Sequence, residues 1–202
     1  MTKEFPEKLM QIGQALQEAL ANKPVKLAQN DYNRRASVLI PLCWEQDQVQ
    51  VLFTKRTSHL PHHAGQISFP GGSMELQDSS LAHTAMRETH EEIGVPMENM
   101  GILTRLDQLT TATGFLVTPY LGLINYSANY SINENEVEKI IIVPLVKVLN
   151  PANYQPVEIQ WQGTRTYWTA LVDQGEVIWG VTARILLGFI DSLKQANFTL
   201  KD

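Results

Sequence analysis

Cysteine is nearly absent from this chain, which has Cys43 and no other cysteine among its 202 residues. A single cysteine excludes an internal disulfide and a zinc site built from several cysteines. Cys43 ends the apolar run of residues 36–43, so we expect a buried thiol. A catalytic thiol is the alternative, but nothing nearby in the sequence supplies an obvious base.

An excess of basic charge and a long apolar run are also missing. The chain has 16 Lys and Arg against 21 Asp and Glu, a formal net charge of -5. This balance disfavours nonspecific nucleic-acid binding, although it allows a local basic pocket. No run approaches the roughly 18 apolar residues of a membrane span, and residues 1–7 lack the apolar core of a signal peptide. We therefore expect a cytoplasmic protein with no membrane and no nucleic-acid partner.

The chain has 44% hydrophobic and 18% charged residues. This composition and the length fit a single globular domain, which is usual up to roughly 250 residues. Residues 7–22 are expected to form an amphipathic helix, because Leu9, Ile12, Leu16 and Leu20 share one face. We divide the chain into residues 1–33, an N-terminal helix with its connector, and residues 34–202, the main part of the domain.

Short segments rich in Val, Ile, Leu and aromatic residues alternate with helices, without repeats or low-complexity tracts. The expected strands cover residues 36–42, 50–54, 65–69, 101–106, 116–125, 137–143 and 165–172. A last helix is expected to begin near Gly180 and to run through Leu193. This alternation predicts a layered fold of the α/β (α+β) class.

The most informative stretch is residues 87–95, which places Glu88, Glu91 and Glu92 at i, i+3 and i+4 of a helix. Like charges at these spacings cost a helix about 0.2–0.5 kcal/mol per pair. A divalent cation such as Mg²⁺ removes the repulsion, because it takes carboxylate oxygens and leaves room for a substrate phosphate. Arg87 stands one turn before Glu91, close enough to orient it through its guanidinium fork.

The flanks of this stretch support a helix. Asp78, Ser79 and Ser80 offer N-cap side chains, while Gly94 and Pro96 end the helix. A packing stripe is expected at i, i+4, i+7 and i+11, formed by Ala82, Met86, Thr89 and Ile93. The three glutamates would then project away from the stripe and face outward.

Gly71 and Gly72 follow Phe69-Pro70 and begin the loop that leads to the acidic helix. Adjacent glycines let backbone carbonyls and amides approach a ligand closely. Gly-Gly alone is more often an ordinary turn, so its weight comes from the carboxylates that follow it.

At this point the residues resemble the signature of the Nudix hydrolases, G-x5-E-x7-R-E-U-x-E-E-x-G-U, in which U is a bulky apolar residue. The second half matches at Arg87, Glu88, Glu91, Glu92, Gly94 and Val95. The first half departs from it, because Asp78 stands where the signature has Glu and lies nine positions before Arg87 rather than eight. Thr89 also replaces an apolar residue. The one-residue lengthening with Asp resembles the coenzyme A pyrophosphatase branch of the superfamily.

That branch carries a second motif, L-L-T-x-x-S-x-x-x-R-x-x-x-G-x-x-x-F-P-G-G, whose spacing residues 52–72 follow throughout. Phe53 and Thr57 are mild departures, whereas Pro61 replaces the Arg, a natural partner for a nucleotide phosphate. Lys55, Arg56, His62 or His63 could compensate for the lost guanidinium. The resemblance implies substrate binding by Arg56, Gly65, Phe69 and Gly72, and an α/β/α sandwich around a mixed sheet.

Hydrolysis of a diphosphate requires neutralised phosphate oxygens, a deprotonated water and a stabilised leaving phosphate, which bound Mg²⁺ or Mn²⁺ can supply together. Glu88 and Glu92 are the first-choice ligands, and Glu91 would share a metal or position it. The resemblance adds the carbonyl of Gly71. Glu136 matches the acidic position of the family before the next strand and is expected as a metal ligand or general base; a solvated turn is the open alternative. The catalytic set is therefore Arg87, Glu88, Glu91, Glu92 and Glu136.

The resemblance implies a small-molecule nucleoside diphosphate substrate, with coenzyme A or a derivative giving 3′,5′-ADP and 4′-phosphopantetheine. Another nucleoside diphosphate derivative, such as ADP-ribose or NADH, is the close alternative. A non-catalytic nucleotide-binding module is a third, although it need not keep a costly acidic cluster. A homodimer is an expectation at the family level only.

Overall fold

The computed structural model describes residues 4–27, 34–60, 63–126, 130–161 and 163–200. Helix α1 (Glu7–Ala21) comes first, followed by the long strands β1 (Arg34–Glu45) and β2 (Gln48–Arg56). Two short strands, β3 (Ile67–Ser68) and β4 (Gly71–Ser73), then lead to helix α2 (Leu81–Ile93). These elements agree with the expected helix at 7–22 and with the acidic helix.

The chain continues through η1 (Met97–Asn99), β5 (Met100–Arg105), β6 (Leu109–Thr110), β7 (Phe115–Ile124) and β8 (Val137–Pro144). Helix α3 (Leu145–Leu149) and η2 (Pro151–Asn153) precede β9 (Tyr154–Trp161), β10 (Thr164–Asp173) and β11 (Glu176–Ile178). Helix α4 (Gly180–Gln195) is the last element, where the sequence predicts it. Among the described residues, no helix combines the length and hydropathy needed to cross a membrane.

Eight strands form one mixed sheet, with the order β3-β2-β1-β7-β5 and with β4, β6 and β8 paired to β1, β7 and β2. Strands β1 and β7 run parallel, with Arg34 opposite Phe115 and Leu42 opposite Leu123. The other pairs in this sheet are antiparallel. The β1–β7 pair at its centre explains why β1 is apolar on both faces, since both faces are covered.

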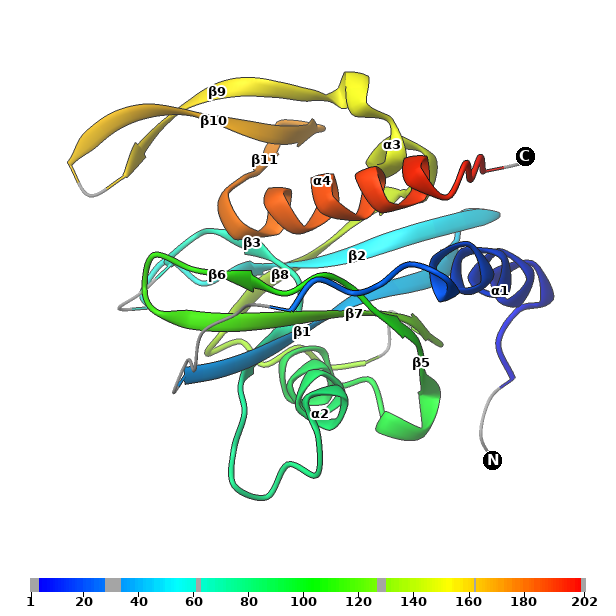
Figure 1. The fold of residues 1–202 in the computed structure, drawn as a ribbon. Helices are drawn as coiled ribbons and strands as arrows, with labels where there is room; N and C mark the ends of the chain where they lie inside the picture. Colours follow the sequence, from blue (N-terminus) through cyan, green and yellow to red (C-terminus); the bar gives the residue numbers. More distant parts are fainter. Residues whose placement is uncertain (1–3, 28–33, 61–62, 127–129, 162, 201–202) are drawn as a thin grey trace.

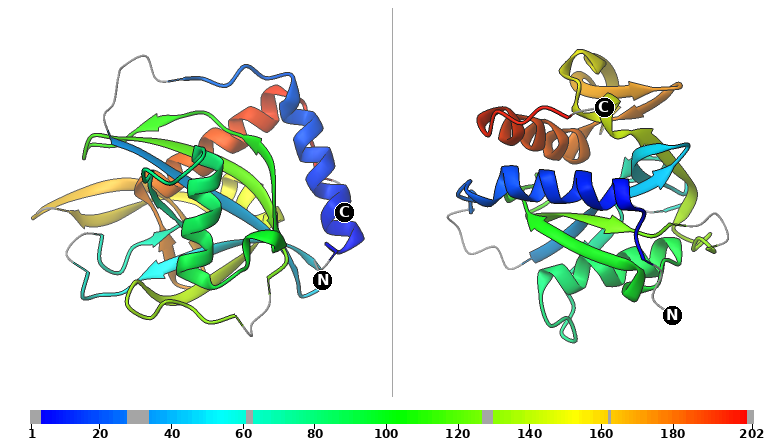
Figure 2. Two further views of the ribbon diagram at one scale, coloured as in Figure 1. Left: turned by 90° about the horizontal axis from the view of Figure 1, so that it is seen from below. Right: turned by 90° about the vertical axis from the view of Figure 1, so that its right-hand side faces the viewer.

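Helices cover the two faces of this sheet (Figures 1 and 2). Helix α2 lies on one face, where Ala85 and Ile93 pack against Leu39 and Leu52. Helices α1 and α4 lie on the other, where Leu9, Leu16, Leu186 and Phe189 share a second cluster with the sheet. Burying each such side chain contributes about 1.5–3 kcal/mol. The expected α/β/α sandwich with a mixed sheet is confirmed.

Strands β9, β10 and β11 form a separate three-stranded sheet, which Figure 1 shows on the side of α4 away from α2. Only the strand at 165–172 was expected there. Strand β9 contains Pro156, which argues against a strand, but the run from Val157 to Trp161 alternates apolar and polar residues and was the signal available in the sequence. Strand β4, with the sequence Gly-Gly-Ser, was likewise expected as a loop, and it forms because β1 pairs with it.

Cys43 is completely buried in the cluster beneath α2. Burial, together with the charge of Glu45, raises the pKa of its thiol to about 12. The expectation of a buried thiol is confirmed, and the thiol is protonated at neutral pH.

Candidate active site

Helix α2 is capped as the sequence predicts. The Ser80 hydroxyl accepts a hydrogen bond from the His83 N–H at 3.1 Å, and Gly94 ends the helix with φ of 71°. The buried face, however, comprises Leu81, Thr84, Ala85, Thr89, Glu92 and Ile93, whereas Ala82 and Met86 are half-buried. Thr89, which replaces an apolar residue of the signature, is buried and donates to the Ala85 carbonyl at 2.7 Å.

The expectation that all three glutamates face outward is wrong for Glu92, which is only 3% exposed. Its carboxylate accepts a hydrogen bond from the Thr54 hydroxyl at 3.2 Å and one from the backbone of Gly71. The pKa of Glu92 is raised to about 8, and burial is the main cause. The two hydrogen bonds and the charge of the nearby Arg56 act in the opposite direction and limit the rise. Glu92 therefore belongs to the junction of α2 with β2 and β4.

Glu88 lies directly over Gly72. A Cβ atom at Gly72 would come within 2.5 Å of Glu88 Oε1, so only glycine leaves room for this carboxylate. Burial is the main cause that raises the pKa of Glu88, and the charges of Glu91 and Glu136 raise it further. Charges that shift the pKa of a carboxyl in this way lie close to it, so Glu91 and Glu136 lie near Glu88.

Gly71, in β4, packs closely against β1. It lies opposite Val38 in β1, and a Cβ atom there would come within 2.3 Å of the Ser37 carbonyl oxygen. This close approach brings the Gly71–Gly72 backbone between β1 and the carboxylates of α2.

Arg87 ties the acidic groups together. Its Nη1 donates to Glu91 Oε2 at 2.8 Å, and its Nη2 donates to Glu88 Oε1 at 3.0 Å and to the Ser73 carbonyl at 3.1 Å. Its Nε and Nη2 also donate to the two oxygens of Asp78 at 3.0 and 3.1 Å. The orienting role expected for Arg87 thus has a geometric basis, with Asp78 as the anchor.

Asp78 is the residue whose role the sequence did not reveal. Its side chain is fully buried and also accepts from the Glu75 N–H, from the Thr84 hydroxyl and from His83. The Arg87 guanidinium holds the pKa of Asp78 well below its usual range, despite the burial that opposes this. Its position in the signature was the available signal, because Asp78 takes the place of the Glu that the signature expects.

Glu136 lies beside this cluster, on the loop before β8. The Asn133 N–H of this loop donates to the Glu92 carbonyl at 3.0 Å, and the Asn133 side chain donates to Glu136 Oε1 at 3.4 Å. The neighbouring Glu134 and Glu138 are exposed.

The expected substrate-binding residues differ in their surroundings. Arg56 has a buried Nε without a hydrogen-bond partner among the described residues, and its charge acts on Glu92. Gly65 lies in the open loop between β2 and β3, with φ of 67°. Phe69 is 2% exposed and stacks on Phe53 with ring centroids 5.0 Å apart, so its side chain belongs to the core. Pro61 and His62 lie outside the described residues.

The remaining histidines have separate partners. His59 contacts the Thr57 hydroxyl, His63 contacts Gln66, His83 contacts Asp78, and His90 contacts the Val95 carbonyl. Within the part of the chain that the structure describes, no three His, Cys, Asp or Glu side chains are already arranged around a metal position. In α2, Arg87 forms ion pairs with Glu88 and Glu91, so these carboxylates are oriented toward its guanidinium and not toward a common metal position.

Comparisons with known proteins identify the family. A family model described as the NUDIX domain matches residues 33–162. An uncharacterized Nudix hydrolase NudL from Enterobacter sp. (strain 638) is 39% identical over 163 residues, which cover 80% of this chain and 84% of that one. A NudL from Yersinia pestis (strain Pestoides F) is 36% identical over 154 residues, covering 76% and 77%.

A solved structure agrees on the fold. The MutT protein from Methanosarcina mazei Go1 has a TM-score of 0.52 and 18% identity, and the match covers 86% of this chain and 100% of that one. Sequence and fold lead to the same assignment: the chain belongs to the Nudix hydrolase family.

Proposed function

We propose that this enzyme is a metal-dependent pyrophosphohydrolase that cleaves the diphosphate of coenzyme A or its derivatives. The observation that carries the proposal is that Glu88 and Glu92 of α2 lie against the Gly71–Gly72 backbone, while the charges of Glu91 and Glu136 act on Glu88. The motif of residues 52–72 and the lengthened spacing from Asp78 to Arg87 favour the coenzyme A branch.

The donor set fits Mg²⁺ or Mn²⁺, because both prefer hard oxygen ligands. Glu88 and Glu92 are the proposed ligands, with Glu91 and the Gly71 carbonyl as further donors. Burial raises the pKa of both Glu88 and Glu92, and a bound cation would favour their charged forms. When bound, the metal supplies positive charge for the phosphate oxygens and makes water easier to deprotonate.

The side chains around the carboxylates have distinct proposed tasks. Arg87, anchored by Asp78, orients Glu88 and Glu91. Arg56, whose charge acts on Glu92, is the proposed partner of a substrate phosphate oxygen. Gly65 and Gly72 allow the chain to approach the substrate closely, whereas Phe69 supports the site from within the core.

Glu136 is proposed as the general base or as an additional metal ligand. It lies near enough to Glu88 to raise the pKa of that carboxyl. A base must come within hydrogen-bond reach of the attacking water, and Glu136 is half-buried on the loop before β8.

The test is product analysis with coenzyme A, ADP-ribose and NADH in the presence of Mg²⁺ or Mn²⁺. We expect 3′,5′-ADP and 4′-phosphopantetheine from coenzyme A, and a loss of at least about 100-fold in kcat/KM for Glu92→Gln. Glu134→Gln is the matched control, because Glu134 is exposed outside the cluster.

Each other outcome has a definite meaning. Turnover of ADP-ribose or NADH alone would keep the metal chemistry and reject coenzyme A as the substrate. Nucleotide binding without turnover of coenzyme A, ADP-ribose or NADH would indicate that the protein is a nucleotide-binding module and not an enzyme. Equal activity of the Glu92→Gln and Glu134→Gln variants would remove Glu92 from the metal site.

A further inference from the structure

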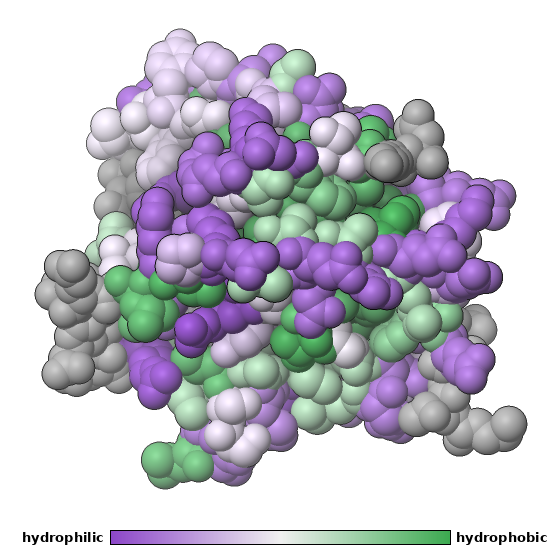
Figure 3. Space-filling model, turned by 45° about the vertical axis from the view of Figure 1, so that its right-hand side comes forward, coloured by the Kyte–Doolittle hydropathy of each residue, from purple (hydrophilic) through white to green (hydrophobic). Residues whose placement is uncertain are grey.

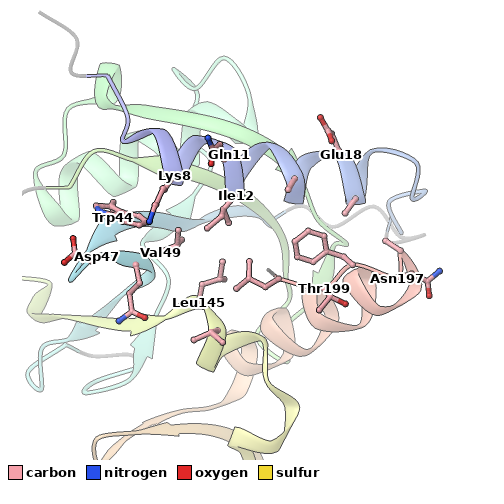
Figure 4. A pocket seen from close by; sticks show the side chains of 17 residues that line it. Lys8, Gln11, Ile12, Glu18, Trp44, Asp47, Val49, Leu145, Asn197 and Thr199 are labelled. Atoms are coloured by element: carbon pink, nitrogen blue, oxygen red, sulfur yellow. The ribbon is translucent and has the colours of Figure 1, made fainter. Parts of the chain in front are cut away.

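A large hollow lies far from the acidic cluster, on the opposite side of the main sheet. It has a volume of about 850 Å³ and is lined by α1, the turn between β1 and β2, α3 and the C-terminal residues 196–200 (Figure 4). Helix α2, which carries the carboxylates, packs on the other face of the sheet. The hollow is therefore separate from the candidate active site.

Apolar side chains from all of these segments form the walls of the hollow: Ile12, Ala19, Val49, Leu145, Phe198 and Leu200. Val146, on its rim, is 55% exposed. Figure 3 shows apolar side chains gathered in the middle of this face, bordered by polar ones.

The hollow is open to the surface, because several residues that line it, among them Gln11, Ala15 and Thr199, are exposed. Its size is that of a ligand-binding cleft. A volume of about 850 Å³ lies within the range of small-molecule pockets, about 300–1,000 Å³.

The charges around the hollow are unevenly placed. Lys8 lies at one end, with its Nζ 5.8 Å from the centroid of the Trp44 ring, and it forms no ion pair within the described residues. Glu18 points away from the hollow in Figure 4, and its carboxylate accepts from the Gln14 amide at 2.8 Å. Asp47 lies in the β1–β2 turn, at the edge of the hollow and at the same end as Lys8. The ammonium of Lys8 thus lies at one end of the hollow.

We propose that this hollow binds a long-chain carboxylate, with the alkyl chain along the apolar walls and the carboxylate at Lys8. The chain covers Ile12, Phe198 and Leu200, which are half-buried where they line the hollow. The Trp44 ring packs on the first methylenes of the chain, where Lys8 already lies over it. This site is independent of diphosphate hydrolysis.

The test is calorimetric titration of the full-length protein with dodecanoate below its micellar concentration. We expect one saturable site, at least about tenfold weaker in Ala15→Phe, whose ring fills the hollow from α1. Lys8→Gln should weaken the binding of dodecanoate by about two- to fivefold. It should leave the affinity for dodecanol unchanged, because dodecanol lacks the charge.

Two variants serve as matched controls. Met10→Phe adds the same ring on α1 at an exposed position that does not line the hollow. Lys194→Gln removes an exposed lysine from α4. Both should bind dodecanoate as the parent does, and none of the four variants should change diphosphate hydrolysis.

Three results would overturn the proposal. The first is the absence of saturable binding, and the second is equal affinity in Ala15→Phe and Met10→Phe. The third is a dimer, seen by sedimentation equilibrium of the ligand-free protein, that Ala15→Phe dissociates. That result would make the hollow an interface between two copies of the chain.

Discussion

Asp78, which precedes α2, and Arg87, which belongs to α2, form a buried ion pair that anchors the acidic helix. The Asp78 side chain is fully buried, and the Arg87 side chain is 12% exposed. Every neighbour of the Asp78 carboxylate donates a hydrogen bond to it, so its charge is compensated. Removing one member of such a pair leaves the other charge buried without compensation.

We expect Asp78→Asn to lower the free energy of unfolding at neutral pH by about 3 kcal/mol. The folded-state pKa of Asp78 is lowered, first by Arg87, so its carboxylate stabilises the protein above the ordinary Asp pKa of about 3.9. That contribution is lost as the pH falls below this value. The difference between parent and variant should therefore shrink in acid.

Urea unfolding at about pH 7 and about pH 3 measures this difference. Asp191→Asn is the control, because Asp191 is exposed on α4 and accepts a hydrogen bond from the Gln195 side chain at 3.1 Å. An equal loss of stability at both pH values would show that the charge of Asp78 is not what stabilises the fold.

Strand β4 is the element that sets the geometry of the site, because it fits between β1 and α2. Its two glycines differ in what surrounds them. A Cβ at Gly72 would meet the end of the Glu88 side chain, whereas a Cβ at Gly71 would meet the backbone of Ser37 and Val38. A side-chain end can move aside, but the backbone of a central strand cannot.

We expect Gly72→Ala to lower kcat/KM at least about tenfold through displacement of Glu88, with a stability loss below about 1 kcal/mol. Gly71→Ala should instead destabilise the fold by about 1–3 kcal/mol or more through overpacking. Kinetics and urea unfolding of both variants separate the two effects.

Gly188→Ala on α4 is the control, since a Cβ there meets nothing within 4 Å. It should be neutral or stabilising by up to about 1 kcal/mol. Full activity of Gly72→Ala would contradict the placement of Glu88 over this glycine.

Within the whole molecule, the three-stranded sheet is attached to the body by two kinds of contact. Leu171 and Ile178 are buried in the core shared by α1 and α4. Glu176 forms ion pairs with Lys55 and Lys139 of the main sheet. These charged groups are solvent-accessible, and such pairs contribute little.

We expect Leu171→Ala to cost about 2–5 kcal/mol of unfolding free energy, because it leaves a cavity in the core. Glu176→Gln should have little effect, and so should Tyr167→Ala on the same strand as Leu171, since Tyr167 is 71% exposed. Guanidinium unfolding compares the three variants. A larger loss from Glu176→Gln than from Leu171→Ala would show that ion pairs hold this sheet.

The sequence by itself determined the acidic helix, its caps and the alternation of strands. Ser80 and Gly94 act on backbone groups within four residues, so their effect can be read locally. The strands of the main sheet carry enough β-branched and apolar residues to be recognised without their partners.

Only the tertiary structure decided which carboxylates are buried and where the Gly-Gly backbone lies. Glu92 is buried because Thr54, 38 positions away in the chain, meets it across the sheet. Strand β4 exists because β1 pairs with it, and the hollow exists because α1, α3 and the C-terminal residues meet there. Such contacts join residues distant in sequence, and helical or strand periodicity carries no information about them.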